Sequence, residues 1–167
     1  MNMSRLVPLV VCASLIVLAA VAMADGLSAP TGKVILTVAG KDVVANTSNG
    51  LELDAAQFAA LPRTSLITVT PFMDGEQDFE GVLLSDLMGA AGIAFARDIR
   101  ATALDDYAVT IPAIDMAGVG ILVADRQNGA PLDPDGMGPL WIIYPADAGV
   151  PDAQDKMIWQ LRSLTVQ

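Results

Sequence analysis

The sequence predicts a single β-rich α+β domain, and three observations lead to this prediction. Short β-branched or apolar runs recur between glycine, proline and aspartate residues, as is typical of strands joined by tight turns. Only two stretches show a convincing helical pattern. The chain has 167 residues, of which 53% are hydrophobic and 17% charged, and this size and composition suit one globular domain.

Residues 1–24 have the pattern of a secretory signal peptide. A single positive charge, Arg5, precedes an apolar run over residues 6–21, and Ala22-Met23-Ala24 forms a small-x-small cleavage site. The run is shorter than the roughly 20 residues that a membrane-spanning helix needs. We therefore expect cleavage rather than a membrane anchor, and a periplasmic or secreted protein without stable membrane insertion.

The domain is expected to begin after a short leader. Residues 25–32 contain Ser, Ala, Pro and Gly without a pattern, which predicts a flexible leader before a domain over residues 33–167. Residues 34–38 alternate apolar and small side chains ahead of a Gly-Lys turn and predict the first strand. Residues 46–50 indicate a turn.

Both predicted helices lie in the first half of the chain. Asp54 caps a helical run over residues 55–61 that a proline stops, and residues 83–92 form a second helix closed by a glycine. Between them, residues 64–70 are β-branched and predict a strand. The acidic residues 74–80 are expected to form a loop.

The second half of the chain is expected to contain strands alone. These strands are short apolar runs ended by turn residues or proline, at residues 100–104, 107–111, 120–124, 140–144 and 158–166. Residues 126–129 indicate a turn. In the last strand we expect the buried face to hold Trp159, Leu161, Leu164 and Val166.

Composition excludes several classes of function. The chain has no histidine and one cysteine, Cys12, which leaves with the signal peptide. Ser-His-Asp and Cys-His catalysis and Cys-rich metal sites therefore cannot be built, and we assign no catalytic and no metal-ligating residue. After cleavage, eight basic residues face 19 acidic ones, a net charge of −11, so nucleic acid is not an expected partner.

Polar and aromatic residues near the predicted strand ends are the candidate ligand-binding residues. Adjacent carboxylates and a phenol follow one strand, and aromatic rings with a carboxylate lie in and after another, so that ring faces and fixed charges are available to a cationic or hydrogen-bonding ligand. A solvated turn and ordinary core packing are the alternative interpretations. The candidates are Asp105, Asp106, Tyr107, Trp141, Tyr144 and Asp147.

The ordered set of segments resembles the oxidoreductase molybdopterin-binding domain family, which has the fold of the sulfite oxidase catalytic domain. The resemblance covers nearly all of the mature chain. It rests on residues 34–40, on Phe79-Glu80-Gly81-Val82-Leu83-Leu84-Ser85-Asp86-Leu87, on Ala103-Leu104-Asp105-Asp106-Tyr107 with Ile111-Pro112, on Asn128-Gly129, on residues 138–145 and on Ile158-Trp159-Gln160-Leu161.

The residues that the resemblance implies for the cofactor are missing. In the enzymes of this family, molybdenum is held by a cysteine after the strand that corresponds to residues 64–70, but Val69-Thr70-Pro71-Phe72 stands there. The family also grips the pterin phosphate with His and Arg near the proline that corresponds to Pro139, and this chain reads Met-Gly-Pro-Leu-Trp. A net negative charge disfavours an anionic cofactor as well.

These observations favour an exported, non-catalytic module of this fold that binds a small ligand or a membrane-bound partner such as a sensor ectodomain. No cofactor is expected in that case. The alternative is a molybdopterin-dependent oxidoreductase whose metal is held without a cysteine. Thr70 or a carboxylate within residues 74–80 would then assist.

Overall fold

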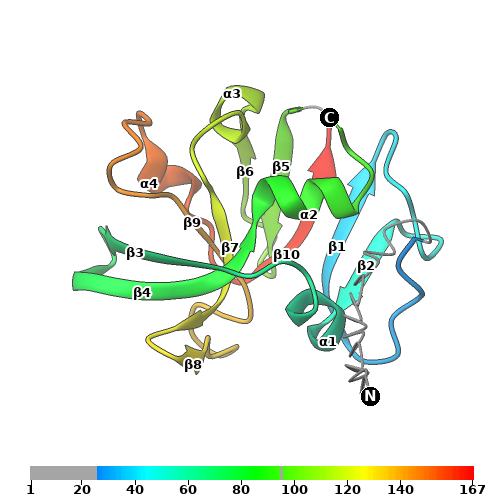
Figure 1. Ribbon diagram of the computed structural model, residues 1–167, viewed down its shortest axis with the longest axis horizontal. Coiled ribbons are helices and arrows are strands. Elements are labelled where there is room, and N and C mark those ends of the chain that lie inside the picture. Colours follow the sequence, from blue (N-terminus) through cyan, green and yellow to red (C-terminus); the bar gives the residue numbers. More distant parts are fainter. Residues whose placement is uncertain (1–25, 95) are drawn as a thin grey trace, which may run out of the picture.

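The computed structural model describes residues 26–94 and 96–167, and the predicted signal peptide lies outside these residues. Ten strands in the described part form two five-stranded sheets. Their bounds are β1 Val34–Gly40, β2 Leu51–Asp54, β3 Thr64–Thr70, β4 Met73–Leu83, β5 Ile99–Ala103, β6 Ala108–Ile111, β7 Leu122–Gln127, β8 Ala130–Pro131, β9 Trp141–Ile143 and β10 Leu161–Val166. The domain is β-rich, as predicted (Figure 1).

The first sheet joins the two ends of the described chain. Its order is β2-β1-β10-β5-β6, and β1 pairs with β10 in parallel, with Thr37 opposite Ser163. All other pairs in this sheet are antiparallel. Because the first and last strands are neighbours at its centre, this sheet forms only when the whole domain is assembled.

The second sheet is built around a long hairpin. Its order is β3-β4-β7-β8, and β9 also pairs with β7. The β3–β4 hairpin reaches well beyond the rest of its sheet (Figure 1). Gly81 lies in the part of β4 that pairs with β7, opposite Ala124. A Cβ atom at Gly81 would come within 2.1 Å of the Val123 carbonyl oxygen, so a side chain would force the two strands apart.

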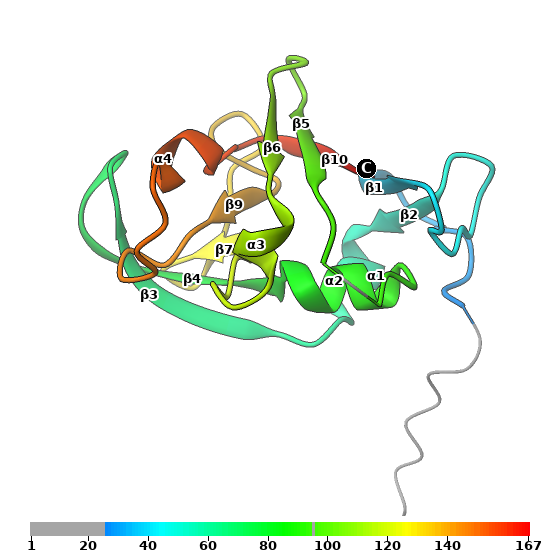
Figure 2. The ribbon, with the colours of Figure 1, turned by 90° about the horizontal axis from the view of Figure 1, so that it is seen from above.

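Four helices complete the described chain, and two of them are single turns. Their bounds are α1 Ala55–Ala59, α2 Leu84–Ala90, α3 Ala113–Met116 and α4 Ala153–Lys156. Asp54 caps α1 in a capping box with Gln57, as its position in the sequence predicts. Figure 2 shows α1 and α2 on the same side of the first sheet. None of the helices in residues 26–94 and 96–167 is long and apolar enough to cross a membrane.

The core divides into two clusters. The larger is formed by residues of both sheets and of the helices, and it includes Leu36, Phe58, Leu87 and Val123, all fully buried. The smaller lies in the second sheet and contains Phe79 and Trp141, also fully buried.

Most predicted elements are confirmed, but the prediction of a loop over the acidic residues 74–80 is wrong. Residues 74–80 lie inside β4, where residues 76–80 pair with β3 and residues 79–80 pair with β7 as well. Glu76, Asp78 and Glu80 occupy alternate positions and share one face of the strand, which is why a polar sequence can be a strand here. Asp74 is set apart from them by a register shift and by the positive φ of Gly75. Strand β2 and the one-turn helices α3 and α4 were not predicted.

The last strand and the leader also differ in detail from expectation. Leu161, Leu164 and Val166 are buried as predicted, whereas Trp159 is 40% exposed and precedes β10. Within the leader, the backbone N–H groups of Thr31 and Gly32 donate to the Asp54 carboxylate at 3.1 and 2.9 Å. This end of the leader is therefore held against the domain.

We expect Asp54→Asn to weaken the fold in a pH-dependent way. Hydrogen bonds from the backbone of Gln57 and of Gly32 lower the pKa of Asp54 below its ordinary value of 3.8. The stabilisation is therefore present above about pH 4 and is lost as the pH falls through the lower folded-state pKa. The Tm of the variant should lie below that of the wild type at pH 7, and the difference should shrink towards pH 3.

Asp86→Asn is the matched control, because this exposed carboxylate on α2 makes no hydrogen bond within the described residues. A Tm difference for Asp54→Asn that stays constant between pH 7 and pH 3 would contradict the role of the charged carboxylate.

Candidate functional site

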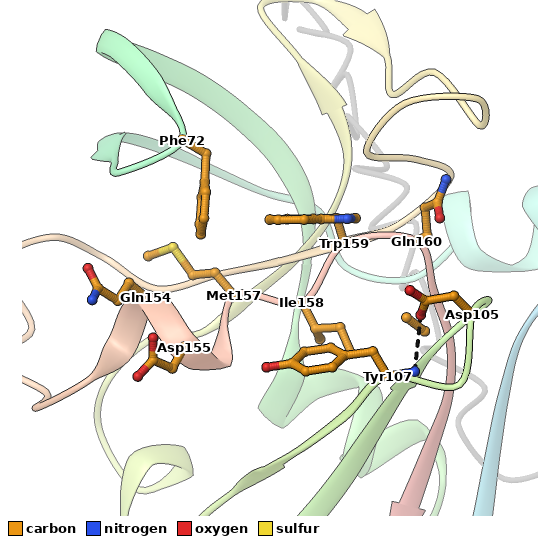
Figure 3. Close-up of a pocket in the computed structure, with 10 residues that line it drawn as sticks. Phe72, Asp105, Tyr107, Gln154, Asp155, Met157, Ile158, Trp159 and Gln160 are labelled. Atoms are coloured by element: carbon orange, nitrogen blue, oxygen red, sulfur yellow. Dashed lines mark hydrogen bonds between the residues drawn. The ribbon is translucent and has the colours of Figure 1, made fainter.

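A pocket of about 310 Å³ lies where three segments meet. Phe72 comes from the tip of the β3–β4 hairpin, Asp105 and Tyr107 from the β5–β6 turn, and the remaining wall from residues 154–160 (Figure 3). The sequence separates these segments by some 30 to 50 residues each, so only the tertiary fold creates the pocket.

Residues 157–160 are held in place by backbone hydrogen bonds to the segment that contains β9. The Trp141 indole N–H donates to the Met157 carbonyl at 3.2 Å, and the Ile142 N–H donates to the Ile158 carbonyl at 2.9 Å. Gln160, at φ +49°, donates its backbone N–H to the Met137 carbonyl at 3.1 Å. This wall of the pocket therefore has a fixed backbone.

Aromatic rings form one side of the pocket. The rings of Phe72 and Trp159 meet edge to face with centroids 5.0 Å apart, and both side chains are about two-fifths exposed. Trp141 lies behind them, 6.0 Å from Phe72 and 6.4 Å from Trp159. Figure 3 shows Tyr107 across the pocket from Trp159. A planar ligand would find ring faces here.

Two carboxylates give the pocket its charge. Asp105 and Asp155 lie at opposite ends of the lining in Figure 3, and no Lys or Arg is among the lining residues. The Asp105 carboxylate accepts the Tyr107 backbone N–H at 3.0 Å, which orients the β5–β6 turn. The site therefore presents negative charge beside aromatic rings.

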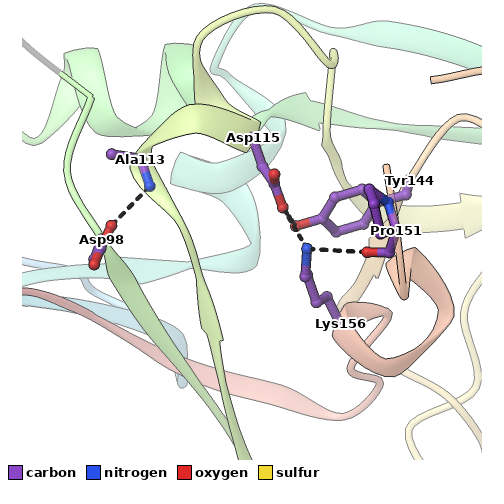
Figure 4. A network of polar contacts seen from close by, with 6 residues as sticks. All are labelled: Asp98, Ala113, Asp115, Tyr144, Pro151 and Lys156. Atoms are coloured by element: carbon purple, nitrogen blue, oxygen red, sulfur yellow. Dashed lines mark hydrogen bonds and ion pairs between the residues drawn. The ribbon is translucent and has the colours of Figure 1, made fainter. Parts of the chain in front are cut away.

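A buried polar network holds α4, which carries Asp155, against the domain (Figure 4). The Lys156 ammonium donates to Asp115 at 2.7 Å, and the Tyr144 hydroxyl donates to the same carboxylate oxygen at 3.1 Å. Burial, and then the negative charge of Asp115, raise the pKa of Tyr144 far above its ordinary value, so this phenol stays protonated.

The structure brings together only part of the predicted site. Asp105 and Tyr107 line the pocket, and the Trp141 ring packs behind the lining residues Phe72 and Trp159. Asp106 instead forms an ion pair with Arg162. Tyr144 is fully buried in the Asp115 network, and Asp147 lies in an exposed turn outside the pocket lining.

Sequence reasoning missed several lining residues. Phe72 lies at a hairpin tip that the sequence did not predict as a hairpin, because β4 was expected to be a loop. Trp159 was placed on the buried face of a strand that begins two residues later. The pocket residues Gln154 and Asp155 belong to the one-turn helix α4, which is too short to show a helical pattern in the sequence.

Thr70 lies in the window of residues 69–72, where the resemblance implies a metal-ligating cysteine. Its side chain is 5% exposed, and its hydroxyl oxygen is buried without a hydrogen-bond partner among the described residues. Residues 26–94 and 96–167 also contain no group of three or more His, Cys, Asp or Glu side chains arranged to hold a metal ion.

Comparisons with known proteins agree with this architecture. A family model described as oxidoreductase molybdopterin binding domain matches residues 56–165. Among solved structures, the chain is similar to the sulfane dehydrogenase SoxCD from Paracoccus pantotrophus, with a TM-score of 0.63 and 14% sequence identity. No curated protein matches the sequence.

The match to SoxCD includes most of this chain but less than half of the SoxCD chain. It covers 84% of this chain and 40% of the SoxCD chain, so this chain spans about two-fifths of that length. At 14% identity the likeness shows a shared fold. The family model covers well over half of the chain. The chain therefore belongs to the oxidoreductase molybdopterin binding domain family.

Proposed function

We propose that this protein is an exported, non-catalytic member of the family that binds a small ligand, or a membrane-bound partner, through the aromatic and acidic pocket. The observation that carries the proposal is the composition of this pocket: Phe72 and Trp159 supply ring faces, Asp105 and Asp155 supply negative charge, and no basic side chain lines it. Export rests on the signal-peptide pattern of residues 1–24.

The pocket fits a small planar cation with N–H donors. A volume of about 310 Å³ is at the lower end of the range for small-molecule sites. A cation over an aromatic face is attracted by the ring quadrupole, and carboxylates at both ends of the lining accept hydrogen bonds from N–H groups. A ligand with a negative charge would instead be repelled.

The pocket that contains Phe72, Asp105, Asp155 and Trp159 does not fit a molybdenum-bound pterin. The family binds molybdopterin, which carries a phosphate, but the pocket offers that phosphate two carboxylates and no cation. Lys156 lies nearby in sequence, yet its ammonium is engaged with Asp115. No thiol is available at residues 69–72. These features support binding without redox chemistry, and we derive no catalytic step.

One observation favours the alternative of a cysteine-free oxidoreductase. The Thr70 hydroxyl oxygen is buried and lacks a hydrogen-bond partner among the described residues, and it lies in the window of residues 69–72 where the resemblance implies the metal ligand. An unpartnered buried oxygen is costly, and an additional ligand is one way to satisfy it.

We expect benzamidine, a small planar cation with N–H donors, to bind the mature protein more tightly than benzamide or benzoate. These three probes share a ring and differ in charge, so calorimetric titration separates stacking from charge recognition. Trp159→Ala should weaken benzamidine binding about tenfold, because it removes an aromatic face. Asp155→Asn should weaken benzamidine about threefold and leave benzamide unchanged.

Asp147→Asn is the control, since Asp147 is an exposed carboxylate outside the pocket lining. Equal affinity for benzamidine and benzoate would rule out the acidic recognition proposed here.

Protein exported from a host that makes molybdenum cofactor should contain no molybdenum. The measurement is elemental analysis of residues 25–167 after gentle purification, with pterin fluorescence of the denatured sample. Near-stoichiometric molybdenum would favour the oxidoreductase alternative instead. In that case Thr70→Val should reduce the metal content.

Lys156→Met should both lower the stability of the protein and weaken the binding of benzamidine in the pocket. The side chains of Lys156 and Asp115 are only 18% and 8% exposed, so removing the cation leaves a buried carboxylate with Tyr144 alone. We expect a loss of about 3 kcal/mol in the free energy of unfolding. Tyr144→Phe should cost about 1 kcal/mol, because it removes one hydrogen bond and no charge.

Urea denaturation measures both values, and benzamidine titration of the folded fraction reports on α4. Lys33→Met removes an exposed cation elsewhere and should change neither quantity. If Lys156→Met is as stable as the wild type, the network does not hold α4.

A further inference from the structure

Strand β3 is an unusually long free edge. The outer strands of the two sheets are β2 and β6 in the first and β3, β8 and β9 in the second. Among these, β2 and β6 have four residues each, β8 has two and β9 has three, whereas β3 has seven. Within the described residues, β4 is the only strand that pairs with β3, so its other edge offers backbone N–H and C=O groups along the whole strand.

The sequence of β3 lacks the features that usually protect an edge. Natural edge strands are commonly short or carry lysine, proline or inward-pointing charges that prevent pairing with another chain. Strand β3 reads TSLITVT, with no charge and no proline, and it is rich in β-branched residues. Ile67 and Val69 are 66% and 47% exposed on its outer face. Such an edge is suited to accept an added strand.

The neighbouring strand specifies the charge of that added strand. In the register of the hairpin, Ile67 lies opposite Asp78, Val69 opposite Glu76 and Ser65 opposite Glu80. Opposed residues in an antiparallel pair share a face, so a row of three carboxylates runs beside the exposed apolar residues. Glu80 also lies 3.8 Å from the Arg126 guanidinium in an exposed ion pair, so Glu76 and Asp78 carry most of the free negative charge of the row. One oxygen of Asp78 is buried and has no hydrogen-bond partner among the described residues.

We propose that β3 is a docking strand for an extended, basic segment of a partner protein. The segment would add to the free edge of β3, place apolar side chains beside Ile67 and Val69, and direct Lys or Arg side chains towards the carboxylates of β4. An added strand lies about 10 Å from β4, two strand spacings away, which an extended Lys or Arg side chain can bridge in large part.

A second copy of this chain fits the edge less well. Pairing of two β3 strands would bring two rows of carboxylates to one surface, on molecules that each carry a formal charge of −10. This surface is separate from the pocket, and the proposal does not depend on ligand binding there.

A synthetic peptide tests the proposal directly. The probe is a fluorescein-labelled heptapeptide with lysine and valine in turn at its odd positions and threonine at its even positions, so that lysine and valine share one face of the extended strand. Its binding to the protein is measured by fluorescence anisotropy. We expect saturable binding, together with slower amide hydrogen exchange in residues 64–70 when the peptide is present. The same peptide methylated on alternate backbone nitrogens keeps its charge but cannot pair as a strand, and it should not bind.

Matched variants separate strand addition from general attraction between opposite charges. Ile67→Ser, at an exposed position, should lower the affinity for the peptide by about threefold or more. The pair E76Q/E80Q should weaken it about fivefold. The pair D86N/D135N makes the same change in charge at exposed positions away from β3 and should leave the affinity within about twofold.

Two results would overturn the proposal. Equal binding of the N-methylated peptide, or equal loss in both charge-neutralised pairs, would mean that the peptide adheres to acidic surface in general. A wild-type dimer that Ile67→Ser converts to a monomer, measured by light scattering, would mean that a second copy occupies the edge.

Discussion

The wall of the pocket depends on the hydrogen bonds that fasten residues 157–161 to residues 137–142. The Trp141 indole provides one of these bonds to Met157, and main-chain groups on either side provide the others. Trp141 is fully buried, so its N–H needs a partner inside the protein, and the Met157 carbonyl supplies it. The Trp141 side chain therefore both packs in the smaller core cluster and holds the pocket wall in place.

The fold of the family is retained while the chemistry of the pocket differs from what the resemblance implies for its enzymes. Cofactor binding through a thiolate and basic residues needs a few specific side chains, whereas the sheets need only apolar residues at the correct alternation. Residues 25–167 keep the apolar pattern and contain neither a cysteine nor a histidine. Aromatic and acidic residues surround the pocket instead. The apolar pattern that forms the sheets is therefore independent of the side chains that the resemblance implies for cofactor binding.

The sequence predicted the fold better than the site, and the reason is physical. Residues 64–70 and 140–144 are recognisable because burial or β-branching is visible locally. Strand β4 was missed because its acidic residues suggested a solvated loop, although their period of two was available in the sequence. Asp106 and Tyr144 were predicted to join Asp105 and Tyr107, but a left-handed turn directs Asp106 to Arg162 and burial takes Tyr144 into the core. Such choices depend on tertiary contacts.

The grouping of Phe72, Trp141 and Trp159 has an optical consequence. The protein has two tryptophans, and their ring centroids are 6.4 Å apart at the pocket. All of its intrinsic tryptophan emission therefore originates at one location, where one indole is fully buried and the other is partly in contact with solvent. The protein carries a built-in reporter of this region, and the colour and intensity of that emission follow the polarity around Trp159 without any attached dye.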